Sequence, residues 1–143
     1  MTIRQISVFV GNSTGGIADI ADIVGKSGAD IRALSIADTA AYGILRLIVD
    51  DPTKAAMALS EADYIVSVTD VIAAQIDDAP GGLSRALRPL SDAGISIEYA
   101  YAFVTRKAKN ACVVLRVEDN DAASAILEAN GVKLMSSEDI CGF

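Results

Sequence analysis

Apolar side chains near the start of the chain follow first the two-residue period of a strand and then the period of a helix. Ile6, Val8 and Val10 occupy every second position, which predicts a half-buried strand over residues 5–10. A Gly-Gly pair at Gly15 follows this stretch. Apolar residues then recur at three- and four-residue intervals: Ile17, Ile20, Ile23 and Val24. The sequence therefore predicts a strand that passes into a helix at a Gly-Gly turn.

Glycines and apolar runs mark the elements that come next. Gly28 stands where a helix C-terminal glycine belongs, and a second strand is expected from Ile31. A third strand is predicted over residues 43–49 and a short second helix over residues 53–59. A strand over residues 64–68 closes this unit, whose element order is β-α-β-β-α-β.

The same pattern occurs again 66 residues further along the chain. Residues 5–16 match residues 71–82, which contain the second Gly-Gly pair. The elements predicted for this second copy are strands at 71–76, from 97, at 112–117 and at 132–135, a helix that ends at Gly94, and a helix at 121–127. Pro89 lies inside the first of these helices and is expected to bend or shorten it.

The repeat predicts two domains, residues 1–69 and residues 70–143. Each is expected to be an α+β, ferredoxin-like βαββαβ unit with both helices on one face of an antiparallel sheet. A unit of this size buries little core by itself, so we expect the two sheets, and two copies of the chain, to pair.

Composition narrows the possible partners. Of the 143 residues, 52% are apolar and 22% are charged, which predicts a folded globule. The formal charge is −7 and the basic residues are scattered, so direct nucleic-acid binding is not expected. The chain has no long apolar segment and no signal-peptide pattern, so we expect no membrane partner and a cytoplasmic location.

The residues for most enzyme chemistry are missing. Histidine is absent, which removes the commonest general base and transition-metal ligand. Cys112 and Cys141 lie far apart and form no CxxC pair. The acidic pairs and the run at 118–121 lack the EF-hand pattern and are interpreted as solvated loops. We therefore predict no catalytic residue, no metal and no cofactor, with a small enzyme using Asp, Lys or Tyr as the alternative.

The Gly-Gly turns offer a different kind of chemistry. A strand that leads through glycines into a helix presents free backbone N–H groups and the positive end of the helix dipole, which attract an anion. Asn12 or Asp78 at the strand end offers oxygen acceptors for an ammonium group. Residues 11–16 match neither a P-loop nor GxGxxG, so nucleotides are not favoured. Each turn is suited to a zwitterion, and the alternative is that it only caps the helix.

An aromatic row distinguishes the two copies. Tyr99, Tyr101 and Phe103 share one side of the predicted strand. The residues 66 positions earlier are small: Ala33, Ser35 and Ala37. We interpret the row as packing in the core or sheet interface, with the wall of a ligand pocket as the alternative.

With the repeat and the turns in place, the sequence resembles a tandem of ACT domains, a family of small-molecule-binding regulatory modules. Residues 78–83 look like the family's Asx-x-Pro-Gly turn, and residues 93–101 look like its Ala-Gly-Ile-Asn-Ile strand entry. The first unit carries weaker versions at 12–16, which lacks the proline, and at 27–31. The resemblance covers residues 3–140 and implies two units joined side by side into an eight-stranded sheet.

The resemblance also implies where amino acids bind, namely where the strand-to-helix turn of one unit faces the other unit. In the first unit the implied ligand contacts are Asn12, Ser13, Thr14, Gly15 and Gly16, with Ala29, Asp30 and Ile31 as a facing wall. In the second unit they are Asp78, Ala79, Pro80, Gly81 and Gly82, with Ile95, Ser96 and Ile97 as the wall. Whether both turns bind is left open, because the first lacks the proline.

The expected function is a non-catalytic sensor. It would bind amino acids at the interface of two ACT-like units, act as a homodimer, and regulate a separate enzyme or transcription factor. The alternative is a structural or protein-interaction module of the same fold that binds no ligand.

Overall fold

The structure, a computed structural model, describes residues 1–11, 14–38, 42–104 and 110–142. The chain divides into two compact units. We call residues 4–69 the N-terminal unit, and residues 70–143 together with 1–3 the C-terminal unit. Within the described ranges, no helix is both long and apolar enough to cross a bilayer.

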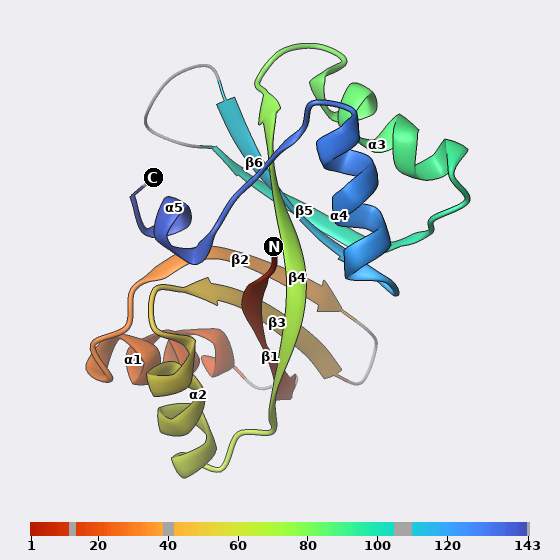
Figure 1. Ribbon diagram of the computed structural model, residues 1–143. Helices are drawn as coiled ribbons and strands as arrows, with labels where there is room; N and C mark the ends of the chain where they lie inside the picture. Colours follow the sequence, from red (N-terminus) through yellow and green to blue (C-terminus); the bar gives the residue numbers. More distant parts are fainter. Residues whose placement is uncertain (12–13, 39–41, 105–109, 143) are drawn as a thin grey trace. The chain divides into compact units, whose positions relative to one another are not determined.

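The N-terminal unit has the predicted element order (Figure 1). Its elements are β1 (Ile3–Gly11), α1 (Gly16–Lys26), β2 (Ile31–Asp38), β3 (Tyr42–Val49), α2 (Pro52–Glu61) and the start of β4 (Val66–Asp77). Strand β3 pairs antiparallel with both β1 and β2, and β4 lies beside β1. The strand order in this unit is therefore β4-β1-β3-β2, which is the ferredoxin-like order.

Helices α1 and α2 cover the same face of this sheet. The buried core between them and the strands consists of Ile6, Val8, Ile20, Val24, Ala29, Leu45, Leu47, Val49, Ala55 and Leu59. Alternate residues of β1 and β3 supply the sheet side of this core, and residues spaced as on one helix face supply the other side. The two periods read from the sequence therefore correspond to real strand and helix faces.

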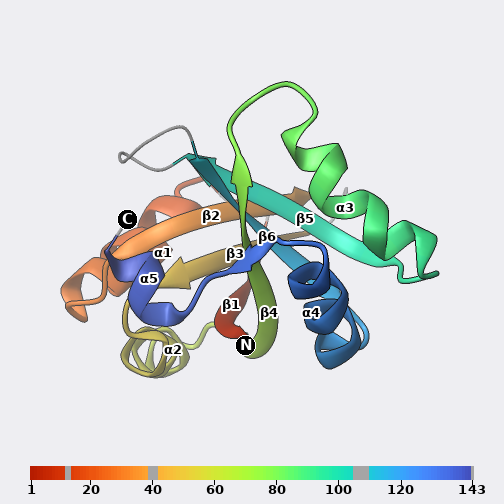
Figure 2. The same ribbon diagram turned by 45° about the horizontal axis from the view of Figure 1, so that its top comes forward.

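The C-terminal unit repeats this architecture (Figure 2). Its elements are the remainder of β4, α3 (Gly82–Asp92), β5 (Ile97–Val104), β6 (Asn110–Val117), α4 (Asn120–Ala129), β7 (Lys133–Leu134) and α5 (Ser137–Cys141). Strand β6 pairs antiparallel with β4 and β5, and β7 pairs antiparallel with β4. The order β7-β4-β6-β5 matches that of the N-terminal unit. The core under α3 and α4 is Ile72, Ala74, Leu90, Val113, Leu115, Val117, Ala123, Leu127 and Leu134.

One strand serves both units. The sequence predicted separate strands at 64–68 and 71–76, but β4 is a single strand that runs from Val66 to Asp77. The residues between the two predicted strands include neither glycine nor proline, so nothing interrupts the extended backbone. The described residues consequently form seven strands, where four for each unit were expected.

Two local features bear on the sequence predictions. Pro89 was expected to bend or shorten its helix, and α3 is not shortened, since its 11 residues equal the length of α1. The proline occupies the last turns, where it leaves only one backbone acceptor without its usual partner. The short helix α5 was not predicted, although Ser136 and Asp139 form a capping box at its start.

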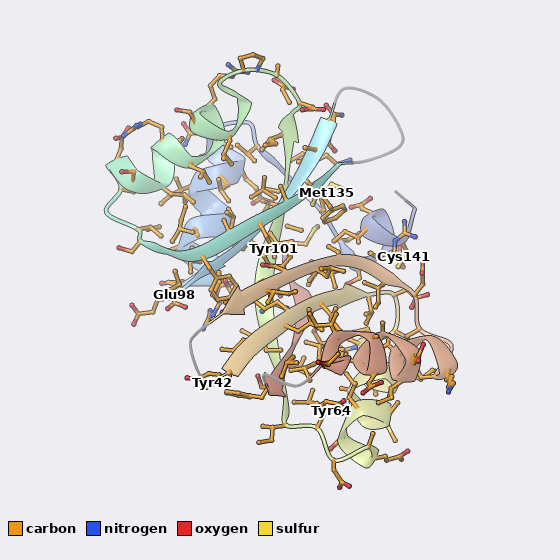
Figure 3. All side chains as sticks on the ribbon, turned by 180° about the vertical axis from the view of Figure 1, so that it is seen from behind. Tyr42, Tyr64, Glu98, Tyr101, Met135 and Cys141 are labelled. Carbon is orange, nitrogen blue, oxygen red and sulfur yellow. The ribbon has the colours of Figure 1, made fainter. Side chains whose placement is uncertain are left out.

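The aromatic row lies on the face of β5 that points away from the helices. Ala100 and Ala102 stand opposite the core residues Leu115 and Val113, so the alternate positions belong to the other face. Tyr101, labelled in Figure 3, stands opposite the buried Val114 and is itself half-buried. The row is therefore not part of the core under α3 and α4, and its interpretation as packing at a sheet interface stays a prediction.

Candidate functional site

The turn between β4 and α3 depends on a left-handed residue. Gly81 has φ +82° and occupies the N-cap position of α3. The backbone N–H of Gly82 donates to the carbonyl of Ala79 at 3.0 Å, and the N–H of Arg85 donates to the carbonyl of Gly81 at 3.0 Å. A side chain at Gly81 would be strained, because residues with a Cβ rarely adopt this conformation.

Gly82 is required for a different reason, which is space. A Cβ built on Gly82 would contact the backbone oxygen of Asp77 and lie 3.2 Å from its carbonyl carbon. Gly82 is buried, whereas Asp78, Ala79, Pro80 and Gly81 are exposed. The predicted turn residues are thus accessible on the outer side and tightly packed on the inner side.

The N-terminal unit repeats this turn geometry. Gly15 has φ +87° at the N-cap of α1, and its carbonyl accepts from the N–H of Asp19 at 2.9 Å. Gly16 is the first residue of the helix, and Thr14 is exposed. The predicted contacts Asn12 and Ser13 lie outside the described residues.

The two turns differ in charge at matching positions. Arg85 and Asp19 each donate their N–H to the N-cap glycine carbonyl, so they occupy the same place in the two copies. The guanidinium of Arg85 lies 3.1 Å from the position that a Cβ on Gly81 would take, and 3.7 Å from a carboxylate oxygen of Asp77. A cation therefore stands beside the second turn, while the residue at the matching position of the first turn is an aspartate.

The starts of α1 and α3 also differ from those of α2 and α4. The carboxylates of Asp51 and Asp119 accept backbone N–H groups and so cap α2 and α4. No described side chain caps α1 or α3. Unpaired N–H groups in a first helical turn are the usual partners of a bound carboxylate or phosphate.

The predicted turns and walls do not come together inside a unit. In each unit the turn precedes the first helix and the wall follows that helix, so an 11-residue helix separates them. At the α-helical rise this is a separation of about 16 Å. Within each unit the predicted turn and the predicted wall therefore lie at opposite ends of the first helix.

In the predicted wall of the N-terminal unit, the backbone N–H and carbonyl of Asp30 already form hydrogen bonds within the unit. The N–H of Asp30 donates to a carboxylate oxygen of Asp50 at 2.8 Å, and the Asp30 carbonyl accepts from the Asp50 N–H at 3.1 Å. Ala29 is buried and Ile31 packs against the core. Within the predicted wall at 29–31 only Asp30 is exposed, and its backbone N–H and carbonyl are already hydrogen-bonded.

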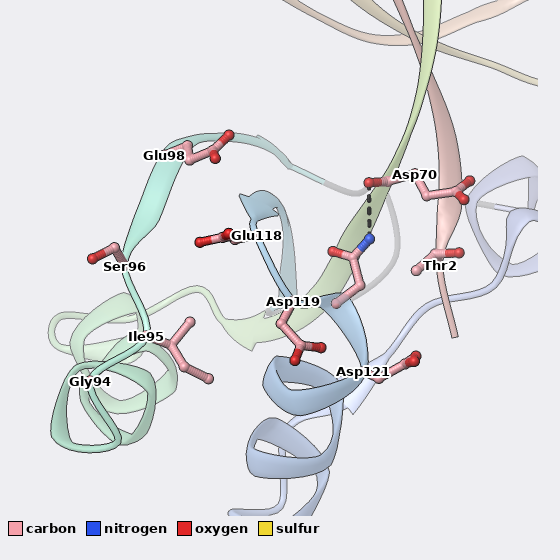
Figure 4. Close-up of a pocket in the computed structure, with 10 residues that line it drawn as sticks. Thr2, Asp70, Gly94, Ile95, Ser96, Glu98, Glu118, Asp119 and Asp121 are labelled. Atoms are coloured by element: carbon pink, nitrogen blue, oxygen red, sulfur yellow. Dashed lines mark hydrogen bonds between the residues drawn. The ribbon is translucent and has the colours of Figure 1, made fainter.

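The wall of the C-terminal unit borders an acidic pocket of about 910 Å³ (Figure 4). Five of its ten lining residues carry carboxylates, and none carries a positive charge. The lining residues are Thr2, Asp70, Gly94, Ile95, Ser96, Glu98, Glu118, Asp119, Asn120 and Asp121. The amide of Asn120 donates to the Asp70 carbonyl at 3.1 Å. This pocket repels a free carboxylate, unlike the turn beside Arg85.

Two features of the site were not anticipated from the sequence. Arg85 was not among the predicted contacts, although its place four residues after the left-handed glycine is visible in the sequence. The acidic pocket gathers residues from segments distant in the chain, which no motif reveals. In the part of the chain that the structure describes, no group of three or more Cys, Asp or Glu side chains has a metal-binding arrangement.

The fold and the turn geometry agree with a family match over the whole sequence. The model of the ACT domain pair family matches residues 1–143. The chain belongs to this family. A search among proteins of curated function finds no match to this ACT pair.

Solved structures share the fold. Protein BT0572 from Bacteroides thetaiotaomicron is 35% identical over 98% of this chain and 96% of its own, with a TM-score of 0.91. The regulatory subunit of aspartate kinase from Thermus thermophilus is 16% identical over 88% and 89%, with a TM-score of 0.66. The corresponding subunit from Thermus flavus is 15% identical over 90% of each chain, with a TM-score of 0.63. At these lower identities the likeness shows the fold alone.

Proposed function

We propose that this ACT pair is a non-catalytic sensor that binds a free amino acid at the turn between β4 and α3. The observation that supports it is the cation of Arg85 beside the exposed Gly81 turn, at a helix start that no described side chain caps. The fold shared with aspartate kinase regulatory subunits supports a regulatory role.

The turn offers complementary groups for both ends of an amino acid. The ligand carboxylate binds the Arg85 guanidinium and the free N–H groups of the first turn of α3, since charge-assisted hydrogen bonds are the stronger ones. The ligand ammonium group binds the exposed carboxylate of Asp78. Gly81 leaves the backbone uncovered so that the ligand approaches closely.

The proposal assigns unequal roles to the two turns. At the first turn Asp19 replaces Arg85, so its carboxylate repels the ligand carboxylate. We therefore place the functional site at residues 78–82, and expect residues 12–16 to bind the ligand more weakly or not at all. The wall opposite the ligand, at 95–97 or 29–31, comes from a second copy of the chain in a homodimer. The amino acid would favour one packing of this dimer, and a separate enzyme or transcription factor in the cytoplasm would respond to it.

The residues present also argue against catalysis. The sequence has no histidine to activate a hydroxyl or thiol. Burial raises the pKa of the Cys112 thiol to about 12, so it is not a nucleophile at neutral pH. This supports a binding function rather than a reaction.

A thermal-shift screen against the common amino acids tests the proposal. A ligand at 100 times its dissociation constant adds about 2.7 kcal/mol to the apparent stability, which raises Tm clearly. Arg85→Gln should weaken binding about tenfold or more, because a hydrogen bond to a charged group is lost. Arg88→Gln, on the same helix three residues further on, is the matched control and should bind normally.

Substitutions at two separate glycines, Gly81 and Gly131, provide a second test with its own control. Asn tolerates the left-handed conformation, so Gly81→Asn should fold but obstruct the turn. Gly131→Asn makes the same change at φ +77°, where a Cβ meets no atom within 4 Å, and should leave binding intact. If no amino acid shifts the Tm of the wild type, the sensor proposal fails and the ligand-free interaction module replaces it.

A further inference from the structure

A cavity of about 390 Å³ lies where the segment around α5 meets the strands of the C-terminal unit. This volume is within the range of small-molecule sites. Strands β4, β6 and β7 each contribute one polar side chain, and the segment around α5 contributes the rest. The lining includes Gln75, Asn110, Lys133, Met135, Glu138 and Asp139. The cavity belongs to one unit and shares no residue with the turn at 78–82 or with the acidic pocket.

The strand positions that line this cavity have apolar counterparts in the N-terminal unit. The strand pairings place the counterparts at the same points of the two sheets: Phe9 for Gln75, Tyr42 for Asn110 and Ile65 for Lys133. The rings of Phe9 and Tyr42 contact each other at a centroid distance of 5.6 Å, and both are almost half exposed. No helix follows the last strand of this unit, because β4 continues into the C-terminal unit. The unit that carries α5 therefore has polar groups where the other unit has apolar ones.

Packing of α5 against the sheet does not explain this exchange. A helix that only covered the sheet would favour apolar side chains beneath it, since burying a polar group without a hydrogen bond costs free energy. Met135, labelled in Figure 3, follows this rule and is 1% exposed. Gln75 does not follow it: the residue is half-buried, yet within the described residues its side-chain amide has no hydrogen-bond partner. Such an amide is available to a ligand in the cavity.

The cavity also presents opposite charges that do not pair. Lys133 and Glu138 are exposed and both line it. In the part of the chain that the structure describes, neither of them forms an ion pair. The carboxylate of Asp139 is held chiefly by Ser136, whose N–H and hydroxyl donate to it at 2.9 Å, and Lys133 acts on it only through a longer-range attraction. One ammonium group and one carboxylate are thus left for a ligand.

We propose that this cavity binds a small zwitterion with an uncharged, hydrogen-bonding side chain, at a site separate from the turn at 78–82. The ligand carboxylate binds the ammonium group of Lys133, and the ligand ammonium group binds the carboxylate of Glu138. The amide of Gln75 supplies a donor and an acceptor to the ligand side chain. Met135 forms an apolar part of the wall.

Other classes of ligand fit the cavity less well. A dicarboxylate or a phosphate meets one cation, Lys133, and two carboxylates, Glu138 and Asp139. A free amine meets the ammonium group of Lys133, which repels it. A metal ion is not favoured, because no group of three or more Cys, Asp or Glu side chains within the described ranges has a metal-binding arrangement. A zwitterion satisfies both charges at once.

Backbone amide signals of isotope-labelled protein locate the binding. The titration uses L-glutamine, L-asparagine, L-serine and L-threonine, with Arg85→Gln protein so that the turn at 78–82 does not contribute. At least one of them should shift the signals of Gln75 and of residues 133–142 in a saturable way. Acetate and methylammonium, which each carry only one of the two charges, should leave these signals unchanged.

Charge-removing variants test the assigned contacts. Lys133→Gln and Glu138→Gln should each weaken binding at least tenfold, because each removes a hydrogen bond between charged groups. The matched controls are Lys26→Gln on α1 and Glu128→Gln on α4, which change exposed residues outside the cavity and should bind normally. Circular dichroism confirms that each variant folds.

The outcomes separate this site from the proposed function of the turn. Binding at the cavity should persist in Arg85→Gln, whereas binding at the turn should be lost there. Signals around the cavity that stay unchanged with all four amino acids, equal shifts with acetate, or undiminished binding by both Lys133→Gln and Glu138→Gln would each overturn the cavity proposal. None of these results bears on whether the turn binds an amino acid.

Discussion

The backbone oxygen of Asp77 occupies the space that a Cβ on Gly82 would need. This contact joins the end of β4 to the first residue of α3 and sets the direction in which the helix leaves the sheet. Because the neighbour is backbone and not a flexible side chain, it has little room to move. The turn that presents Gly81 and Arg85 is therefore held by a close backbone contact.

Gly82→Ala should destabilise the protein by about 1–3 kcal/mol, because the added methyl forces the turn open. Gly25→Ala is the matched control, since Gly25 lies inside α1 and a Cβ there meets nothing within 4 Å. That change should stabilise the protein by up to about 1 kcal/mol through helix propensity. Urea unfolding measures both. Equal effects from the two substitutions would show that the contact with Asp77 is unimportant.

The two thiols should differ sharply in reactivity. Cys112 has no exposed surface, and its burial raises the pKa of the thiol to about 12. Cys141 is exposed on α5 (Figure 3). Intact-mass spectrometry after iodoacetamide treatment at pH 8 should show one modification on the native protein and two in denaturant. Two modifications on the native protein would contradict the packing of Cys112 in β6.

Stability should depend on pH through the cap of α5. The N–H and hydroxyl of Ser136 donate to one carboxylate oxygen of Asp139, both at 2.9 Å, and hold the pKa of that carboxyl below its ordinary value of 3.8. A group whose pKa is lowered by folding stabilises the folded state above its unfolded pKa. That stabilisation is lost as the pH falls through the folded pKa.

Asp139→Asn removes this titration and serves as the comparison. The wild type should be more stable than Asp139→Asn at pH 6, and the difference should shrink as the pH falls below about 4. Urea unfolding of both proteins at a series of pH values measures this difference in the free energy of unfolding. A stability difference that stays constant from pH 6 to pH 3 would show that the Asp139 carboxylate does not act through its charge.

Much of the fold could be predicted because each unit follows simple periods. Val8 and Leu47 mark strand faces, Ile20 and Leu59 mark helix faces, and the 66-residue repeat shows the order twice. The residues at which the individual helices and strands begin and end were less predictable. The continuous β4 and the short β7 depend on pairing with distant strands, which local propensity does not contain.

The candidate site could be predicted only in part. The glycines revealed the turns, because a positive φ at a helix start has a strong residue preference. The role of Arg85 depends on which way its side chain points, and the acidic pocket depends on bringing Asp70 near Glu118. Such relationships arise from tertiary packing, so the sequence pattern alone does not reveal them.

Backbone amide signals of the isotope-labelled protein report most directly on whether the turn after β4 binds an amino acid. Titration with each common amino acid should shift the amide signals of residues 81–85 at a ligand concentration that saturates, and the shifts should be lost in Arg85→Gln but kept in Arg88→Gln. Absence of any shift, or shifts confined to residues 94–98 and 118–121 around the acidic pocket, would contradict the account.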